Sequence, residues 1–171
     1  MAYLIDASSL IEAQNRYFPF DICPGFWDWL EHQNKLGIVY SIDRVYQELV
    51  DRGDDLAIWA RERNDAFFLP TDNTITTSMT NVSSWLMNVS QAGIPFTRAA
   101  VTKFLGDADP FLVAHALAGQ HIVVTEEVGN QIGQIKEVKI PTVCQHFKIR
   151  AINIHDALRE TGAKLILSEM E

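Results

Sequence analysis

Acidic residues occupy positions in this sequence where parallel strands and helices of an α/β protein would bring them together. Asp6 directly follows the apolar run YLI, and Glu126 and Glu127 directly follow the run HIVVT. Glu48 lies in a stretch whose apolar residues have helical spacing, and Asp109 precedes the alanine-rich stretch PFLVAHALA. Because ligands of parallel sheets sit beyond the carboxyl ends of the strands, we expect these carboxylates to converge at one edge of a sheet.

A group of converging carboxylates favours divalent-metal chemistry. Carboxylates that lie close together raise each other's pKa unless a cation compensates their charge. Oxygen ligands of this kind suit Mg²⁺ or Mn²⁺, and the two cysteines, Cys23 and Cys144, form no metal-ligand pattern. Any one of the acidic residues alone would more often be a cap or a solvated surface charge. Together they predict metal-assisted phosphoryl chemistry.

The elements that must position these residues alternate along the chain. Apolar runs predict strands at residues 3–5, 38–40, 67–69, 121–125 and around 149–154. Amphipathic or capped segments predict helices at residues 9–17, 24–36, 42–52, 55–64, 71–91, 96–105, 109–118, in a short stretch after 141, and from 155. Strands that alternate with helices predict an α/β fold with a central, mostly parallel sheet covered on both faces.

Several helix ends carry specific signals. Ser8 or Ser9 is a possible N-cap for the first helix, and Ser41 for the third. Gly37 is expected at the C′ position that ends the second helix. Pro110 is expected at the first position of the alanine-rich helix.

Length and composition predict one soluble domain, residues 1–171. The chain has 47% hydrophobic and 21% charged residues, which is close to the globular average. Its net charge of −8 argues against binding bare nucleic acid through net charge alone, but not against an acidic nucleic-acid site filled by metal. The start MAYLID lacks the basic region of a signal peptide, and no apolar run approaches the length of a membrane span. We therefore expect no membrane association and a cytoplasmic protein.

Four acidic blocks of the chain resemble, in order, those of PIN-domain nucleases. The blocks are YLIDASSLIEA, SIDRVYQELV, GDADPFLVAHALA and HIVVTEE. The PIN-domain family includes the VapC-type ribonuclease toxins of toxin–antitoxin systems. The resemblance covers roughly residues 3 to 155, and the aromatic segment YFPFDICPGFWDWLE distinguishes this chain as a separate PIN-like branch. It implies a PIN-like three-layer α/β/α sandwich.

The resemblance assigns a role to each acidic position. Asp6 matches the aspartate of the first strand, Glu48 the helix glutamate and Asp109 the aspartate before the small-residue helix. These three are implied to be catalytic metal ligands, together with Glu127. The implied supporting residues are Ser8, Thr125, Asp107 and Glu126.

The fourth block departs from the family pattern. Where the family usually has T-x-D, this chain has Thr125 followed by two glutamates. Glutamate is longer by one methylene, so Glu127 could reach a metal through water or turn away. Whether Glu127 or Glu126 completes the site stays open at the level of sequence.

The function implied by the resemblance is that of a Mg²⁺- or Mn²⁺-dependent endoribonuclease. Such an enzyme would hydrolyse RNA phosphodiester bonds, and as a toxin it would bind a small antitoxin. A homodimer is a further expectation, with the aromatic segment contributing to its face. Basic residues around the rim would hold the RNA strand, and the candidates are Arg16, Arg44, Arg98 and Lys103.

The alternative is a PIN-like fold that is kept as a binding module. In that case the protein would bind RNA or another protein, and its metal site would be degenerate. The glutamate at position 127 in the fourth block and the acidic surface leave this alternative open.

Overall fold

The strands form one parallel sheet with the first strand at its centre. The computed structural model describes residues 1–91, 96–134 and 136–166. Within these residues the strand order is β3-β2-β1-β4-β5, and each neighbouring pair is parallel. The bounds are Tyr3–Ile5 for β1, Val39–Ile42 for β2, Phe68–Leu69 for β3, Ile122–Val124 for β4 and Ala151–Ile152 for β5.

Helices make up most of the rest of the described chain. The first helix, α1, continues directly into a short π-helix, η1. The bounds are Ala7–Glu12 for α1, Ala13–Tyr17 for η1, Pro24–Lys35 for α2, Asp43–Val50 for α3, Asp55–Glu62 for α4, Asn64–Phe67 for α5, Asn73–Gln91 for α6, Arg98–Gly106 for α7, Asp109–Gly119 for α8, Ile140–His146 for α9 and Ile154–Glu160 for α10. No helix in the described residues combines the length and hydropathy that a membrane span requires.

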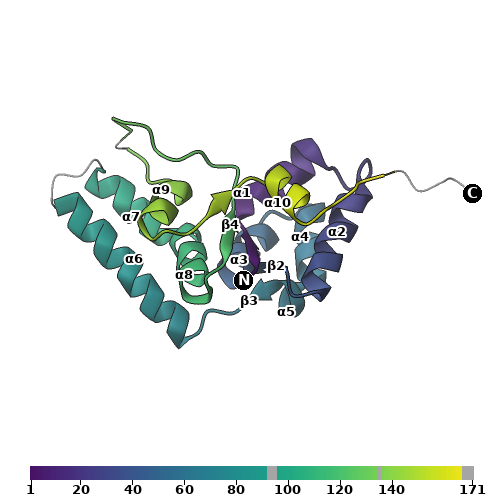
Figure 1. The fold of residues 1–171 in the computed structure, drawn as a ribbon, viewed down its shortest axis with the longest axis horizontal. Helices are drawn as coiled ribbons and strands as arrows, with labels where there is room; N and C mark the ends of the chain where they lie inside the picture. Colours follow the sequence, from purple (N-terminus) through teal and green to yellow (C-terminus); the bar gives the residue numbers. More distant parts are fainter. Residues whose placement is uncertain (92–95, 135, 167–171) are drawn as a thin grey trace, which may run out of the picture.

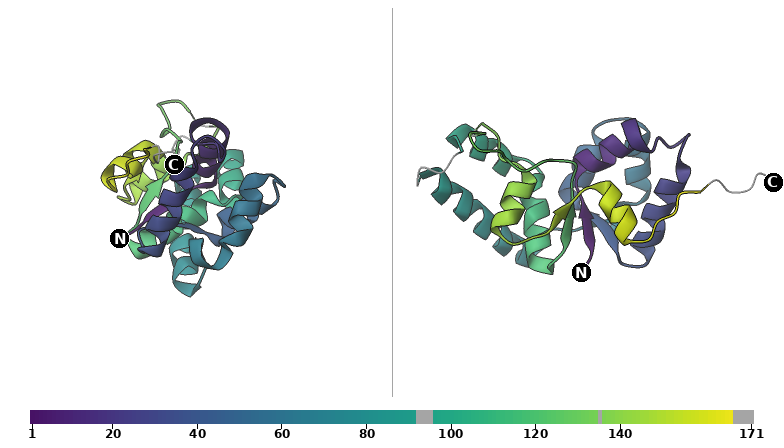
Figure 2. Two further views of the ribbon diagram at one scale, coloured as in Figure 1. Left: turned by 90° about the vertical axis from the view of Figure 1, so that its right-hand side faces the viewer. Right: turned by 45° about the horizontal axis from the view of Figure 1, so that its top comes forward.

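The helices cover both faces of the sheet. Figure 1 shows α6, α7, α8 and α9 on one side of the strands and α1, α2 and α10 on the other. The right-hand view of Figure 2 shows the same two helical groups with the strands between them. The predicted α/β class with a parallel central sheet is therefore confirmed. Because all strands are parallel, their carboxyl ends share one edge of the sheet. The predicted acidic residues that follow strands lie at this edge.

The aromatic segment after η1 packs into the chain's own core. Phe26 is fully buried, with its ring stacked on that of Phe18 at 4.4 Å between centroids. Trp27 donates its indole N–H to the Phe18 carbonyl oxygen at 2.8 Å, and Trp29 donates to Thr161 Oγ1 at 3.1 Å. Burying such rings contributes a large apolar area, and their N–H groups have partners. The segment thus serves the monomer's own packing.

Three predicted helix starts differ from the structure. The N-cap of α1 is Asp6 and not Ser8 or Ser9, because the Asp6 carboxylate accepts from Ser9 N. Ser41 caps no helix: it lies within β2, and its hydroxyl donates to the Ile5 carbonyl oxygen at 2.6 Å. Pro110 is the second helical residue of α8, after Asp109. The Asp6 carboxylate thus takes the cap that spacing assigns to a serine, and the Ser41 hydroxyl bonds to a neighbouring strand instead of a helix start.

Other boundary signals hold in the structure. Gly37 follows α2 with φ of +74°, the left-handed conformation that favours glycine at C′. The start of α3 is fixed by Asp43, whose two carboxylate oxygens accept from Thr71 N at 2.8 Å and Thr71 Oγ1 at 2.9 Å. Since α3 carries Glu48, this contact holds one predicted site residue in place from the segment that follows β3.

Candidate functional site

A cavity of about 520 Å³ lies at the carboxyl ends of the central strands. Five carboxylates from four parts of the chain line it: Asp6, Glu48, Asp107, Asp109 and Glu127. They come from the end of β1, from α3, from the start of α8 and from the segment after β4. The structure thus brings together the acidic residues predicted from the sequence, with the exception of Glu126.

Asp6 is the most buried and the most tightly held member of this group. Its side chain is almost inaccessible, with the residue 3% exposed. Oδ1 accepts from Ser9 N at 2.6 Å, and Oδ2 accepts from Ser8 Oγ and from Thr125 Oγ1, each at 2.7 Å. Burial raises the pKa of Asp6, while these hydrogen bonds oppose the rise. The hydroxyls of Ser8 and Thr125 thus hold the carboxylate in one orientation.

Asp109 is a partly buried carboxylate of the cavity whose surroundings disfavour its ionised form. It is the first residue of α8, where the positive end of the helix dipole favours a carboxylate. Burial comes first among the causes, followed by the charges of Glu127, Asp6, Asp107 and Glu48, and together they raise the pKa of Asp109 to about 7. The Asp109 carboxyl group is thus both removed from water and close to other negative charges.

Glu48 lies on α3 at the rim of the cavity. Much of the residue is open to solvent, but its carboxyl group faces the cavity with the other acids. Partial burial and the charges of Asp6 and Asp107 raise the pKa of Glu48, and the nearby Arg52 only partly opposes this. Asp107 is exposed and lies two residues before Asp109 at the same rim.

The two glutamates after β4 each bind the first amide of a different helix. Glu127 Oε2 accepts from Ile140 N, at the start of α9, at 2.8 Å, and its Oε1 accepts from Lys139 Nζ at 3.1 Å. Glu126 Oε1 accepts from Ile154 N, at the start of α10, at 2.9 Å. Free amides at a helix start favour an anionic acceptor. The pair therefore fastens two helices to the end of β4, and both oxygens of Glu127 are engaged.

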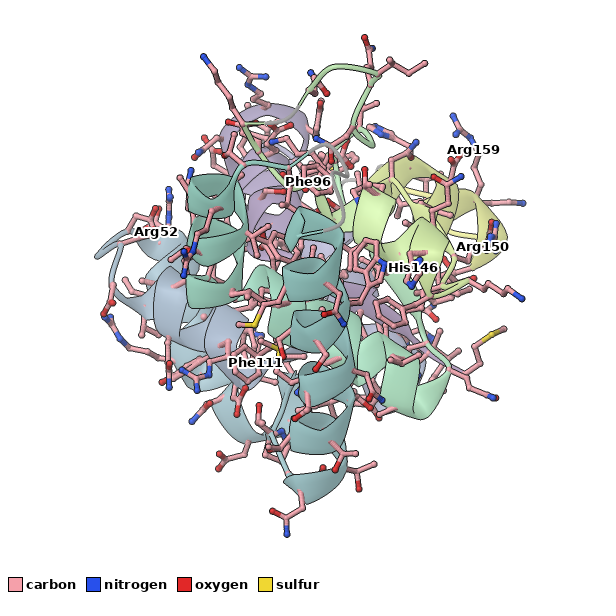
Figure 3. The ribbon with its side chains drawn as sticks, turned by 90° about the vertical axis from the view of Figure 1, so that its left-hand side faces the viewer. Arg52, Phe96, Phe111, His146, Arg150 and Arg159 are labelled. Carbon is pink, nitrogen blue, oxygen red and sulfur yellow. The ribbon has the colours of Figure 1, made fainter. Side chains whose placement is uncertain are left out.

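Positive charge in the cavity is sparse. Within the described chain, the Glu127–Lys139 contact is the one ion pair made by the five carboxylates. Arg44 also lines the cavity, with its guanidinium carbon 4.6 Å from the centroid of the Phe111 ring. In the view of Figure 3, Phe111 lies beside the blue-grey helices of the α3–α4 region.

The other predicted basic residues differ in their placement. Lys103, on α7, lines a smaller cavity that adjoins the first. Arg16 on η1 and Arg98 at the start of α7 are exposed and line neither cavity.

The donor set around the cavity fits Mg²⁺ or Mn²⁺ by its chemistry. All the side chains involved offer oxygen, and Asp6, Glu48 and Asp109 form no ion pair among the described residues. No three His, Cys, Asp or Glu side chains in the same residues approach closely enough to form a complete protein ligand set. Mg²⁺ commonly binds through one or two carboxylates and keeps several waters, so it does not require such a set.

Sequence reasoning missed three contributors to this region. Ser9 acts through its backbone N–H, which no side-chain pattern reveals. Lys139 and Lys136 belong to the segment between β4 and α9, whose path has no periodicity from which it could be inferred. The sequence does contain a signal for the capping role of Glu126 and Glu127. Two glutamates directly follow a predicted strand, and two helix starts come later in the chain.

Comparison with protein families gives one match that spans nearly the whole chain. The family model described as "Domain of unknown function (DUF4411)" matches residues 3–165. None of the curated proteins compared with the chain matches it.

Solved structures similar to this chain share its fold. VapBC2 from Rickettsia felis, bound to a DNA fragment from its promoter, has 14% identity and a TM-score of 0.52, covering 90% of this chain and 98% of that one. VapBC-1 from nontypeable Haemophilus influenzae has 11% identity and a TM-score of 0.52, covering 88% of this chain and 96% of that one. The predicted PIN-like fold of the VapC type is therefore confirmed.

Proposed function

The chain belongs to the family described as "Domain of unknown function (DUF4411)", and because this description assigns no activity, we propose a function from the cavity itself. We propose that the protein is a divalent-metal-dependent endoribonuclease that hydrolyses RNA phosphodiester bonds. One observation carries the proposal: carboxylates from three separate elements, Asp6, Glu48 and Asp109, face one cavity and form no ion pair with any described residue. Such a group needs a cation, and phosphate oxygens are the natural co-ligands of Mg²⁺.

Each acidic residue has a role in this proposal. Asp6, Glu48 and Asp109 would hold Mg²⁺ or Mn²⁺, directly or through water, with Glu127 as a fourth, outer ligand. When bound, the ion lowers the pKa of a coordinated water and stabilises the charge that develops on the phosphate oxygens. Ser8 and Thr125 keep Asp6 oriented toward the cavity. Asp107, at the rim, adds negative charge that strengthens cation binding.

The names of the similar structures extend the proposal to a partner. Both are VapBC assemblies, and we infer that this chain is the toxin of a toxin–antitoxin pair in the cytoplasm. A small antitoxin would inhibit it by placing a basic side chain among the uncompensated carboxylates. We also propose that the protein forms a homodimer, as expected from the sequence. Its interface could bury Tyr17 and Ile22, two exposed hydrophobic residues of the aromatic segment.

A non-catalytic binding module is the second candidate. The observation that favours it is the engagement of both Glu127 oxygens, by Lys139 and by Ile140 N. In that case the acidic cavity would serve as the binding site for a basic segment of a partner, and metal would not be needed.

Incubation of the purified protein with a panel of single-stranded and hairpin RNAs tests the two candidates. A nuclease of this class is expected to cleave RNA in Mn²⁺ or Mg²⁺, and EDTA should abolish the cleavage. Because the attacking group is water, the products should lack a 2′,3′-cyclic phosphate, which attack by the neighbouring 2′-hydroxyl would leave. A folded protein that cleaves none of these RNAs with either ion would support the binding module.

A further inference from the structure

A second cavity beside the acidic one is lined by three lysines. Its volume is about 80 Å³, and its lining includes Lys103 from α7 and Lys136 and Lys139 from the segment between β4 and α9. Asp109 and Glu127 line both cavities, so the two adjoin each other. We propose that this lysine cavity binds the RNA phosphate next to the one that is cleaved. The proposal deepens the proposed function and rests on it.

The charge on the two cavities differs in a way that suits a phosphate in the smaller one. The larger cavity has five carboxylates and one arginine, Arg44. The smaller has four carboxylates and three lysines, which is half of the chain's six lysines. In a chain with net charge −8, positive charge is thus concentrated where a strand would leave the acidic site. The electrostatic field of the lysines would attract a phosphate of an RNA strand whose neighbouring phosphate is bound at the metal in the larger cavity.

Two of the lysines are available for a ligand. Lys139 Nζ contacts Glu127 and Glu137, each at 3.1 Å. Burial alone would lower the pKa of Lys139, but these two contacts outweigh it and the pKa is raised. Lys103 and Lys136 are exposed and make no ion pair with any described residue. They therefore have donors to offer without breaking an existing contact.

A side-chain clasp fixes the segment that carries Lys136 and Lys139. Asn130 Nδ2 donates to the Glu137 carbonyl oxygen at 2.9 Å, and Asn130 Oδ1 accepts from Lys139 N at 3.0 Å. Asn130 N donates to Thr142 Oγ1 at 2.7 Å, which ties the clasp to α9. In Figure 1 this segment, in green, leaves β4 and passes above the side of the molecule that holds α7. The clasp thus brings both lysines opposite Lys103.

The size of the cavity limits what it can bind. A space of about 80 Å³ corresponds to roughly three water volumes. This size suits a phosphate group better than a nucleobase, which needs a larger pocket. The other basic side chain at the site, Arg44 on Phe111, comes from α3, whereas the lysines come from α7 and the segment before α9. An RNA strand would therefore be held on two sides of the carboxylates.

The test measures binding of a fluorescent single-stranded RNA by anisotropy in Ca²⁺, over a series of NaCl concentrations, with the RNA checked for integrity on a gel. The double variant Lys103→Gln, Lys136→Gln is expected to bind about 10-fold more weakly at moderate salt. The slope of log K against log salt should fall by about 0.7, the value for one phosphate contact on a single strand. Two independent phosphate contacts would lower it by about twice as much.

The matched control changes net charge by the same amount at exposed lysines outside the cavity. It is the double variant Lys35→Gln, Lys148→Gln, and its slope should equal that of the wild type. Equal loss of binding in both double variants, or no loss in the first, would overturn the lysine subsite. A wild type that binds no RNA would overturn it too.

The cleavage assay separates this proposal from the proposed function. If the wild type cleaves RNA and the Lys103, Lys136 variant binds RNA as tightly as the wild type, only the subsite fails. If binding follows the expected pattern but the wild type cleaves nothing in Mn²⁺ or Mg²⁺, the subsite stands and the hydrolytic function fails.

Discussion

Replacing either Asp6 or Asp109 with asparagine is expected to lower the rate of RNA cleavage by on the order of 10³-fold at saturating Mn²⁺. Each substitution removes a negative charge from the carboxylate group while keeping the size of the side chain. Asparagine is as good an N-cap as aspartate, so the Asp6 variant should keep the start of α1. The loss would therefore reflect the site and not the fold, which circular dichroism and thermal melts of the same samples would verify.

Two matched variants sharpen this prediction. Asp28→Asn, at an exposed position of α2 outside the cavity, should cleave RNA like the wild type. Glu127→Gln should lose roughly 10-fold or less, because Glu127 is already engaged by Lys139 and Ile140 N. Full activity of the Asp6 and Asp109 variants would remove these residues from the mechanism. A Glu127 effect as large as that of Asp109 would make Glu127 a direct ligand.

Asp109→Asn is also expected to stabilise the protein when divalent ions are absent. In the folded chain the pKa of Asp109 is raised to about 7, against 3.8 for the ordinary carboxyl. A raised carboxyl pKa means that the folded state binds protons more tightly, so stability is lost as pH rises from the ordinary pKa to the folded one. At about pH 8 the ionised group costs the wild type roughly 4 kcal/mol, which asparagine would not cost.

Thermal melts of the two proteins in EDTA from about pH 4 to pH 8 measure this effect. The difference in melting temperature should be near zero at the acidic end and reach roughly 8–16 °C at the basic end. His115, whose pKa burial lowers to about 4, has the opposite pH dependence, but it is present in both proteins and cancels in the difference. A difference that does not change with pH would mean that Asp109 is not electrostatically strained.

Local sequence signals located the acidic residues because each one follows or begins an element. Asp6 follows β1 directly, and Asp109 begins α8 before a proline, so the parallel sheet was enough to bring both to one edge. Glu48 could be predicted only as part of a helix face, and its position at the cavity depends on how Asp43 and Thr71 fix α3.

Contacts between distant parts of the chain could not be predicted in the same way. Glu126 and Glu127 bind amides 28 and 13 residues further along, at helix starts whose positions depend on tertiary packing. The same holds for Asp6, whose side chain caps α1 and also accepts from Thr125, the residue directly after β4. The lysines opposite α7 depend on the Asn130 clasp, for which the sequence has no periodic signal.

The most direct test of the central claim, that the carboxylates form one divalent-metal site, is a calorimetric titration with Mn²⁺. It should be run at about pH 8, where Asp109 is ionised, on the wild type and on Asp6→Asn, Asp109→Asn and Asp28→Asn. We expect the wild type and Asp28→Asn to bind Mn²⁺ alike, and the Asp6 and Asp109 variants to bind it at least about 10-fold more weakly. A folded wild type that binds no Mn²⁺, or variants that bind it as tightly as the wild type, would contradict the claim.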